Sequence, residues 1–348
     1  MTGVQTCALP IWARRISARA IDRRIYDIAP PLLTPQEHVA PRIRGPAQVV
    51  TLDLAIARDT PALSYVAAFA EPWPGALAVY KIANGQWSEP VTTLTKRAMI
   101  GQTLDVLPAG PIGRFDNGAS VTIKFGAGQL VSVSDEAALA GRSLMAIRGE
   151  DGAWEIFAFA RADLVGPATY RLSRLVRGLG GETHLAGRST PAGAIAVLLD
   201  DAVTPLATSI AEIGAPQDYA IGPADLFFDD PLYVRLTATA TNLSLRPYAP
   251  THPRARRTPQ GVEISFIRRA RIHGDAWEIA ETPLDETTPA FEADVTTPAG
   301  ARLLTSTTML FLYPAAQEIA DFGAAQRQLS ISIYQRSEIA GQIGRAHV

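Results

Sequence analysis

The sequence predicts a mainly β protein, and three observations support this class. Apolar and polar residues alternate with a period of two in many short runs, as in antiparallel strands that are half buried in a sheet. Gly, Pro, Asn and Asp, which favour turns, separate the runs. Long amphipathic helical patterns are lacking. We therefore expect a β-rich region over 49–250 and a β-sandwich over 251–341.

Within 49–250, the alternation predicts a series of strands in chain order. They lie at 77–82, 121–125, 154–159, 170–176, 194–199 and 233–240. Asn84-Gly85 follows the first of them and is a hairpin-forming dipeptide, while Gly166 and Pro167 separate the third from the fourth. The best helical candidate is short, at Asp135–Ala140.

A second proline-rich and basic segment, 247–259, predicts a break between domains. Alternation resumes after it, at 262–266, 291–295, 302–308 and 329–333. Strands at this spacing over some 90 residues are typical of a fibronectin type III-like sandwich. Pro314–Phe322 is expected to form a short helical turn between its last strands.

Composition and charge exclude several classes of protein. The chain has 348 residues, of which 47% are hydrophobic and 19% charged, as in globular proteins rather than disordered ones. Its uninterrupted apolar stretches, such as Ala194–Leu199 and Met309–Tyr313, are far shorter than the roughly 20 residues of a membrane-spanning helix. A net charge of −2 argues against nucleic acid as a specific partner.

Both ends of the sequence resemble translated sequencing adapter. The segments are MTGVQTCALPI at 1–11 and IGRAHV at 343–348, and we expect both to be artefacts flanking a piece of a longer reading frame. Segment 1–11 lacks the apolar core of a signal peptide. It also holds the one cysteine, Cys7, so the rest offers no thiol chemistry. Residues 12–48, rich in Arg and Pro, read as an extended connector from a missing upstream domain; a nucleic-acid contact is the less favoured alternative.

The histidines suggest no catalytic triad. Apart from one in the adapter-like tail, they lie in loop-like surroundings, at His38, His184, His252 and His273. The chain has no Gly-x-Ser-x-Gly motif to present a nucleophile on a sharp turn. His273-Gly274-Asp275 could bring imidazole and carboxylate together, but a turn explains it better.

Three acidic pairs could in principle act as general acid and base: Glu150-Asp151, Asp200-Asp201 and Asp229-Asp230. Neighbours on a strand point to opposite faces, so we expect these pairs to cap turns instead. No spacing of His, Cys or acidic residues indicates a metal site.

Four further motifs each have a structural and a functional interpretation. The run Arg177–Gly181 resembles a phosphate loop, but 182–193 does not predict the helix such a loop requires, so we expect a wide turn. Asn242-Leu243-Ser244 fits a glycosylation sequon, a pattern common by chance. His252–Arg257 could hold a phosphate or an acidic partner and is read as a solvated hinge. Trp73 and Trp87 could stack on carbohydrate, although packing on a β core is favoured. We therefore predict no catalytic, cofactor-binding or metal residues in this chain.

Several collinear stretches resemble the large tail-hub protein of gene transfer agents and tailed phages, a family also described as host-specificity or putative phage tail proteins. The stretches are 67–81 (AAFAEPWPGALAVYK), 151–181, 245–257 (LRPYAPTHPRARR), 267–284, 313–323 (YPAAQEIADFG) and 331–341 (ISIYQRSEIAG). The resemblance implies a C-terminal part of such a protein, with a hydrolase-like TIM barrel in the missing upstream sequence and no catalytic residues here.

The resemblance implies a structural role at the tail tip, in the baseplate hub, with host attachment or penetration as its purpose. The implied partners are further copies of the chain in a homotrimer, distal tail and baseplate proteins, and a bacterial surface glycan. The implied location is the virion tail or gene-transfer-agent particle, after synthesis in the bacterial cytoplasm. The alternative is a secreted carbohydrate-binding or glycan-hydrolase accessory region with a fibronectin-like module.

Overall fold

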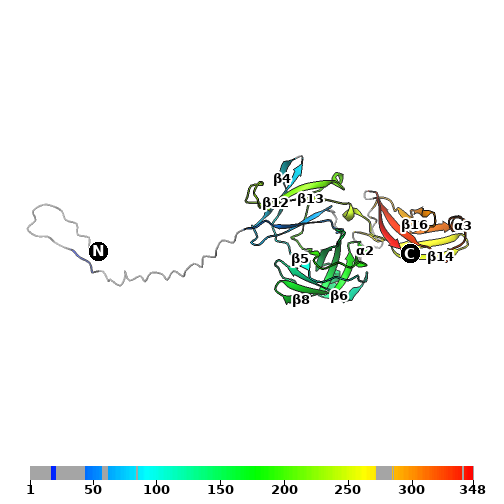
Figure 1. The fold of residues 1–348 in the computed structure, drawn as a ribbon, viewed down its shortest axis with the longest axis horizontal. Helices are drawn as coiled ribbons and strands as arrows, with labels where there is room; N and C mark the ends of the chain where they lie inside the picture. The colour runs from blue at the N-terminus through cyan, green and yellow to red at the C-terminus, as the bar shows by residue number, and fades with distance from the viewer. Residues whose placement is uncertain are drawn as a thin grey trace, which may run out of the picture. The chain divides into compact units, whose positions relative to one another are not determined.

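A computed structural model describes residues 17–20, 44–56, 62–83, 85–271, 284, 286–338 and the backbone of 341–347 (Figure 1). The class prediction is confirmed, since nearly all regular structure is β. The predicted turn residue Asn84, His38 and the His273-Gly274-Asp275 motif lie outside the described residues. Of the predicted connector, 17–20 and 44–47 carry no regular secondary structure. None of the helices in the described part could span a membrane.

The region 48–245 contains a six-stranded closed barrel and two further sheets. The barrel order is β10-β5-β6-β9-β8-β7, and all its neighbours are antiparallel. Its elements are β5 (Ile100–Thr103), β6 (Phe115–Phe125), α1 (Asp135–Leu139), β7 (Leu144–Arg148), β8 (Trp154–Gly166), β9 (Thr169–Leu179), α2 (Thr183–Ala186) and β10 (Ile195–Leu198). The predicted strands at 121–125, 154–159, 170–176 and 194–199, and the helix after Ser134, are confirmed.

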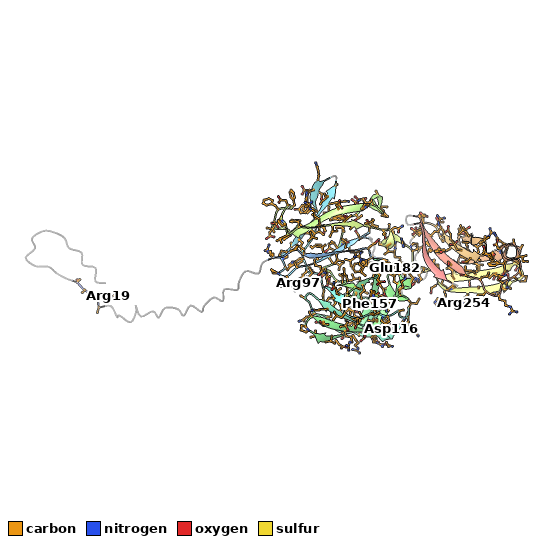
Figure 2. All side chains as sticks on the ribbon, viewed as in Figure 1. Arg19, Arg97, Asp116, Phe157, Glu182 and Arg254 are labelled. Carbon is orange, nitrogen blue, oxygen red and sulfur yellow. The ribbon has the colours of Figure 1, made fainter. Side chains whose placement is uncertain are left out.

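Large apolar side chains fill the barrel interior. Val121, Ile123 and Phe125 of β6 and Phe157 and Phe159 of β8 alternate inward into this core. Figure 2 labels Phe157 among the side chains of the barrel. A barrel of this size has room for side chains and little else, so it is a packed core and no container.

The chain segments on either side of the barrel form the two sheets. One has the order β1-β2-β11 and the other β13-β12-β3-β4. Their elements are β1 (Gln48–Leu52), β2 (Tyr65–Phe69), β3 (Leu77–Ala83), β4 (Gln86–Leu94), β11 (Thr204–Pro205), η2 (Ile210–Glu212), β12 (Pro216–Pro223), β13 (Val234–Thr239) and η3 (Leu243–Leu245). Strands β3 and β4 form the predicted two-residue hairpin, because Ala83 pairs with Gln86.

Strand β2 is buried on both faces. Tyr65 and Ala67 pack in the core shared with the barrel, whereas Val66 and Ala68 pack in the core shared with the four-stranded sheet. All four are inaccessible to solvent. Because successive side chains of a strand point to opposite faces, one strand joins the two halves of this region.

The C-terminal part is the predicted β-sandwich of two sheets, β14-β15-β18 and β17-β16-β19-β20. Its elements are β14 (Thr251–Thr258), β15 (Gly261–Ile267), β16 (Phe291–Thr297), β17 (Gly300–Ser306), β18 (Leu310–Pro314), α3 (Ala315–Phe322), β19 (Ile331–Ser337) and β20 (Gly341–His347). Phe266 stacks on Phe311 at 5.4 Å and meets Phe291 edge-on at 5.0 Å between the sheets. Strand β20 includes adapter-like residues from Ile343 onward and pairs with β19.

The interpretation of His252–Arg257 as a hinge is wrong, since these residues lie in strand β14. An edge strand tolerates proline and exposed charge, and these residues replace the alternating apolar pattern by which a strand is predicted. Pro253 lies where the pairing register of β14 with β15 shifts, between Thr251 and Arg254.

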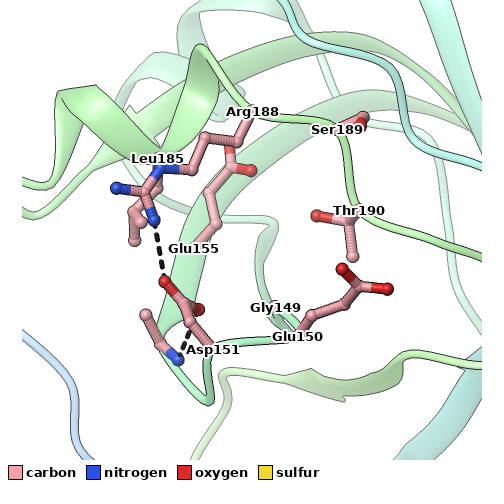
Figure 3. Close-up of a pocket in the computed structure, with 9 residues that line it drawn as sticks. Gly149, Glu150, Asp151, Glu155, Leu185, Arg188, Ser189 and Thr190 are labelled. Carbon is pink, nitrogen blue, oxygen red and sulfur yellow. Dashed lines mark hydrogen bonds and ion pairs between the residues drawn. The ribbon is translucent and has the colours of Figure 1, made fainter.

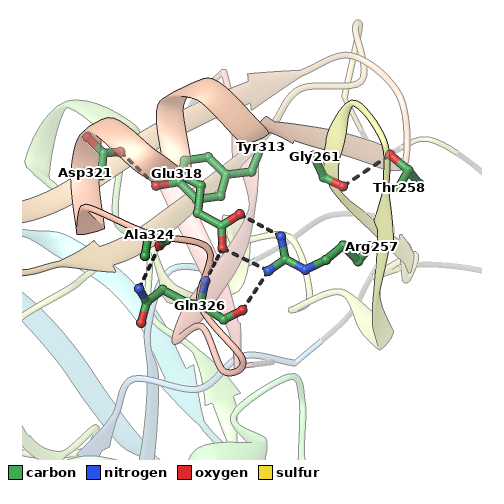
Figure 4. Close-up of polar contacts among 8 residues, drawn as sticks. All are labelled: Arg257, Thr258, Gly261, Tyr313, Glu318, Asp321, Ala324 and Gln326. Carbon is green, nitrogen blue, oxygen red and sulfur yellow. Dashed lines mark hydrogen bonds and ion pairs between the residues drawn. The ribbon is translucent and has the colours of Figure 1, made fainter.

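Ion pairs attach α3, the predicted short helix, to the sandwich (Figure 4). The buried carboxylate of Glu318 accepts hydrogen bonds from both terminal nitrogens of Arg257, at 2.7 and 2.9 Å, and from the backbone N–H of Gln326 at 2.7 Å. Asp321 pairs with Arg302 and accepts a hydrogen bond from the Tyr313 hydroxyl at 2.8 Å. The Arg257 side chain is half exposed, but its guanidinium is engaged by Glu318 and by the Gln326 carbonyl, so it is not a free phosphate ligand.

A buried ion pair joins β8 to β9. Arg177 donates from Nε to Glu155 Oε1 at 2.6 Å and from Nη2 to Oε2 at 2.8 Å, and its Nη1 donates to the Pro108 carbonyl at 2.9 Å. The exposed fractions of the two side chains are 0% and 4%. Burying charges is costly unless each one is paired and hydrogen-bonded, as here.

We expect Arg177→Met to destabilise the barrel by about 3–5 kcal/mol, because it leaves the Glu155 carboxylate buried without a counter-charge. Hydrogen exchange of the β8 and β9 amides, resolved by mass spectrometry, measures the free energy of local opening. The control is Arg188→Met, which removes an exposed pair with Asp151 and should cost below about 1 kcal/mol. Equal losses in the two variants would contradict the assignment.

Candidate functional site

The three acidic pairs lie in three separate turns, as predicted. In each pair one carboxylate accepts a hydrogen bond from a backbone N–H two residues further on. These are Asp151 with Ala153 at 3.1 Å, Asp200 with Ala202 at 3.0 Å, and Asp230 with Leu232 at 2.8 Å. The pairs therefore stabilise turns.

The two described histidines lie in different surroundings. His184 is on α2, with Nδ1 3.5 Å from a Glu182 carboxylate oxygen. His252 lies on β14, beside Arg254, Ser265 and Ile267 in a shallow depression. Among the described residues, no group of three or more His, Cys, Asp and Glu side chains is placed to hold a metal ion.

The glycine run after β9 brings backbones into close contact. Gly178, Gly180 and Gly181 all have positive φ, between 63° and 90°. A Cβ on Gly180 would lie 2.4 Å from the Ala55 carbonyl oxygen, and one on Gly181 2.4 Å from the Tyr248 ring. Only glycine allows both the conformation and the approach.

The expectation that no helix follows this run is wrong, since α2 begins at Thr183. It has only four residues, too few for a helical period to show in the sequence. The run is therefore a packing junction between β9, the chain after β1 and the chain that leads to the sandwich.

Two half-buried carboxylates, Asp53 and Glu182, lie at this junction. Burial raises the pKa of both, and the charge of Asp53 adds to the rise at Glu182, while the Arg246 charge opposes it at each. Asp53 Oδ2 accepts a hydrogen bond from the Thr241 N–H at 3.2 Å. Sequence reasoning missed both residues, because a single acidic residue carries no signal of burial.

The sequon at Asn242 belongs to the same junction. Its Oδ1 accepts a hydrogen bond from Arg246 Nε at 2.9 Å, and Ser244 is almost completely buried. This engagement favours the structural interpretation of the motif.

A small cleft lies between the β7–β8 turn and the chain after α2 (Figure 3). Its volume is about 180 Å³, and the Asp151–Arg188 ion pair, at 2.7 Å, lies at its edge. The Glu150 carboxylate and Thr190 face each other across it (Figure 3). The third lining carboxylate, Glu155, is held by Arg177, so the cleft offers Glu150 and hydroxyl groups to a ligand.

Aromatic side chains gather on the four-stranded sheet and the loop between β12 and β13. Trp87 lies 5.6 Å from Tyr80, 4.8 Å from Phe228 and 6.2 Å from Tyr233, measured between ring centroids. The Arg235 guanidinium lies over the Trp87 ring at 5.4 Å. Burial, with Tyr80 nearby, raises the pKa of Tyr233 to about 12.

The two tryptophans do not form one stacking platform. Trp73 packs against the core between the two sheets and donates from Nε1 to the Gly75 carbonyl at 3.0 Å. Trp87 lies outside that core, with Arg235 over its ring. Both therefore pack on β structure, as the favoured interpretation expects.

The barrel coincides with the match to a known protein family. The family model Rcc01698-like, C-terminal, matches residues 98–197. The match begins two residues before β5 and ends one residue before the end of β10. No curated protein matches the chain. Among solved structures, the FN1–FN3 domains of chicken CNTN1 show 11% identity over 88% of this chain and 98% of that one, with a TM-score of 0.20. The sandwich is assigned from its own strand order.

Substitution of Gly180 tests the packing junction. Gly180→Ala should destabilise the chain by more than about 2 kcal/mol, because backbone strain adds to a clash with the Ala55 carbonyl. The matched control is Gly193→Ala, where φ is +84° and no atom lies within 4 Å of the added Cβ, so only strain of about 1 kcal/mol remains. Urea denaturation measures both, and equal effects would refute the close contact.

The two carboxylates at the junction should also make the free energy of unfolding rise as the pH falls from 7 toward about 5. Asp53 and Glu182 have raised pKa values, so the folded chain binds protons more tightly than the unfolded chain above the ordinary carboxyl range of about 4. Urea denaturation of wild type and of Asp53→Asn/Glu182→Gln measures the effect. The variant should lose most of it, and the remainder comes from Asp200, whose pKa is also raised by burial.

Two carboxylates of the sandwich should change the stability in the opposite direction, so that it falls with falling pH. Arg257 lowers the pKa of Glu318 and Arg302 lowers that of Asp321, so their stabilisation is present above about pH 4 and is lost below it. A pH dependence between 7 and 5 that persists unchanged in Asp53→Asn/Glu182→Gln would contradict the assignment.

Proposed function

We propose that this chain is a structural component of the tail tip of a phage or gene transfer agent. Within the baseplate hub it serves host attachment or penetration and performs no catalysis itself. The observation that carries the proposal is the family match, whose limits follow those of the six-stranded barrel. The matched family is linked by name to gene transfer agents, in agreement with the tail-hub resemblance of stretches inside and outside the barrel.

The architecture suits a rigid structural component. Three layers of strands are joined through β2, and the barrel interior is filled with side chains. Antiparallel sheets with filled cores resist local opening and present loops and sheet faces to neighbours. The proposed neighbours are further copies of the chain, as a homotrimer, distal tail and baseplate proteins, and a bacterial surface glycan.

One observation favours the alternative, a secreted carbohydrate-binding accessory region. The cleft near Glu150 offers a carboxylate and hydroxyl groups, which can hydrogen-bond the hydroxyl groups of a sugar. Such a protein would occur free in the medium, whereas a tail component would occur in particles. Particle association therefore separates the two functions.

Immunogold electron microscopy tests the proposal on particles purified from a bacterium that carries the gene. An antibody against the chain should label one site per particle, at the tail end far from the capsid. An antibody against the major capsid protein serves as the positional control. Presence of the chain in the lysate or medium, but not in purified particles, would overturn the proposal.

A further inference from the structure

The loop between β12 and β13 presents an exposed aromatic tip among acidic residues. Phe227 is 83% exposed and Phe228 44%. Asp225, Asp229 and Asp230 flank them, and we call residues 225–230 the acidic Phe loop. Contiguous apolar surface rimmed by polar residues is typical of interaction sites, and the two neighbouring rings with their flanking aspartates have this arrangement.

The acidic Phe loop is held in one conformation. Leu226 donates its backbone N–H to the Pro223 carbonyl at 3.1 Å, Asp230 to Phe227 at 3.0 Å, and Tyr233 to Asp230 at 3.0 Å. Phe228 rests on Trp87. Phe227 is therefore presented with little conformational freedom left to lose on binding, which favours affinity.

A second exposed surface lies on the outer face of the sheet β14-β15-β18. Strand pairing arranges its side chains in rows: Arg256, Glu263 and Leu312 in one, and Arg254, Ser265 and Leu310 in the next. Ile267 continues the central column. We call this set of seven residues the sandwich face.

The sandwich face has a cationic edge and an apolar edge. Leu310 is 46% exposed, Leu312 45% and Ile267 53%. Arg256 is largely exposed and pairs with Glu263 at 2.8 Å, and Arg254 is exposed opposite Ser265. An inward alternation of Val262, Ile264 and Phe266 fills the core, so the outward apolar residues are not needed for folding.

The two surfaces are complementary. Two strand spacings of about 4.8 Å place the cationic column roughly 10 Å from the leucine column. Phe227 and Asp230 are the two ends of a turn, so their Cα atoms lie within about 7 Å of each other, and the two side chains extend this span to a similar distance. The phenyl ring can cover the leucines while Asp229 and Asp230 face Arg254 and Arg256.

We propose that the acidic Phe loop of one copy of this chain docks on the sandwich face of a second copy. Both surfaces are exposed in the same chain, so the occupant of each is sought in another molecule. Asp225 is paired with Arg44 at 2.7 Å, and the other two carboxylates, Asp229 and Asp230, disfavour an anionic membrane as the partner of the loop. The proposal extends the self-association that the proposed function includes.

The contact joins two different patches, so it is heterologous. Such contacts propagate from copy to copy and form a ring where the rotation closes. An assembly that has not closed into a ring keeps one loop free at one end and one sandwich face free at the other. The interface can therefore be dissected with variants that lack only one of the two patches.

Sedimentation velocity of the intact chain between about 1 and 100 μM, the range of modest protein interfaces, measures the association. Wild type should associate with rising concentration, and less so in high salt. Phe227→Ala and Arg254→Glu/Arg256→Glu should each weaken association at least tenfold. Leu164→Ala, which removes an exposed apolar side chain on β8, is the matched control and should not change it.

The decisive step mixes the two variants. Phe227→Ala keeps an intact sandwich face and Arg254→Glu/Arg256→Glu keeps an intact loop, so the mixture should form a 1:1 complex and nothing larger. Near-ultraviolet circular dichroism verifies that each variant is folded. A wild type that stays monomeric at all concentrations, variants that associate like wild type, or a mixture that forms no 1:1 complex would each overturn the proposal. None of these results bears on immunogold labelling of the tail tip, so the two proposals fail separately.

Discussion

The burial of β2 on both faces is the constraint on which the arrangement of 48–245 depends. Tyr65 and Ala67 belong to the barrel side and Val66 and Ala68 to the side of the four-stranded sheet. A shift of one residue in the pairing of β1 with β2 would exchange the two sets. It would put Tyr65 on the face that now holds Val66 and Ala68, so side-chain volume on both faces fixes the register. The small residues 67 and 68 also let the two layers approach this strand closely.

A second junction holds the chain that connects the barrel to the sandwich. The run Gly178–Gly181 ends β9 and contacts both the chain after β1 and Tyr248. Beyond Tyr248, Arg269 donates to the Ala249 carbonyl at 2.7 Å and Arg271 to the Ser244 carbonyl at 2.7 Å. The chain that connects barrel and sandwich is thus held by hydrogen bonds and by aromatic contact, although its composition suggests a free hinge.

Local alternation predicted strands where the contacts are local. Hairpins such as β3–β4 and β8–β9 join neighbouring segments, and their turns carry their own residue signals. Closure of the barrel is different, because β10 must pair with both β5 and β7, the first about 90 residues earlier in the chain. No local pattern encodes such a pairing. Strand β14 was missed for another reason: an edge strand needs no apolar face of its own.

For the candidate surfaces too, features set by local contacts could be predicted and features set by distant contacts could not. The acidic pairs were recognised as turns, since the Asx hydrogen bond is local. The acidic Phe loop was not recognised, although Asp229 and Asp230 were considered, because the exposure of Phe227 depends on a distant cluster around Trp87 that accommodates only Phe228. Exposure is a property of the assembled sheet and not of the dipeptide.

The filled barrel decides where recognition can occur in this chain. Its interior holds Met99, Met145, Phe157 and other apolar side chains, so no ligand can bind inside it. Specificity must then reside in loops and outer faces, where the acidic Phe loop, the sandwich face and the cleft near Glu150 all lie. Barrel and sheets hold these surfaces in place through buried strands, while the surfaces themselves contribute little to the cores. Sequence change at the surfaces is therefore compatible with an unchanged scaffold.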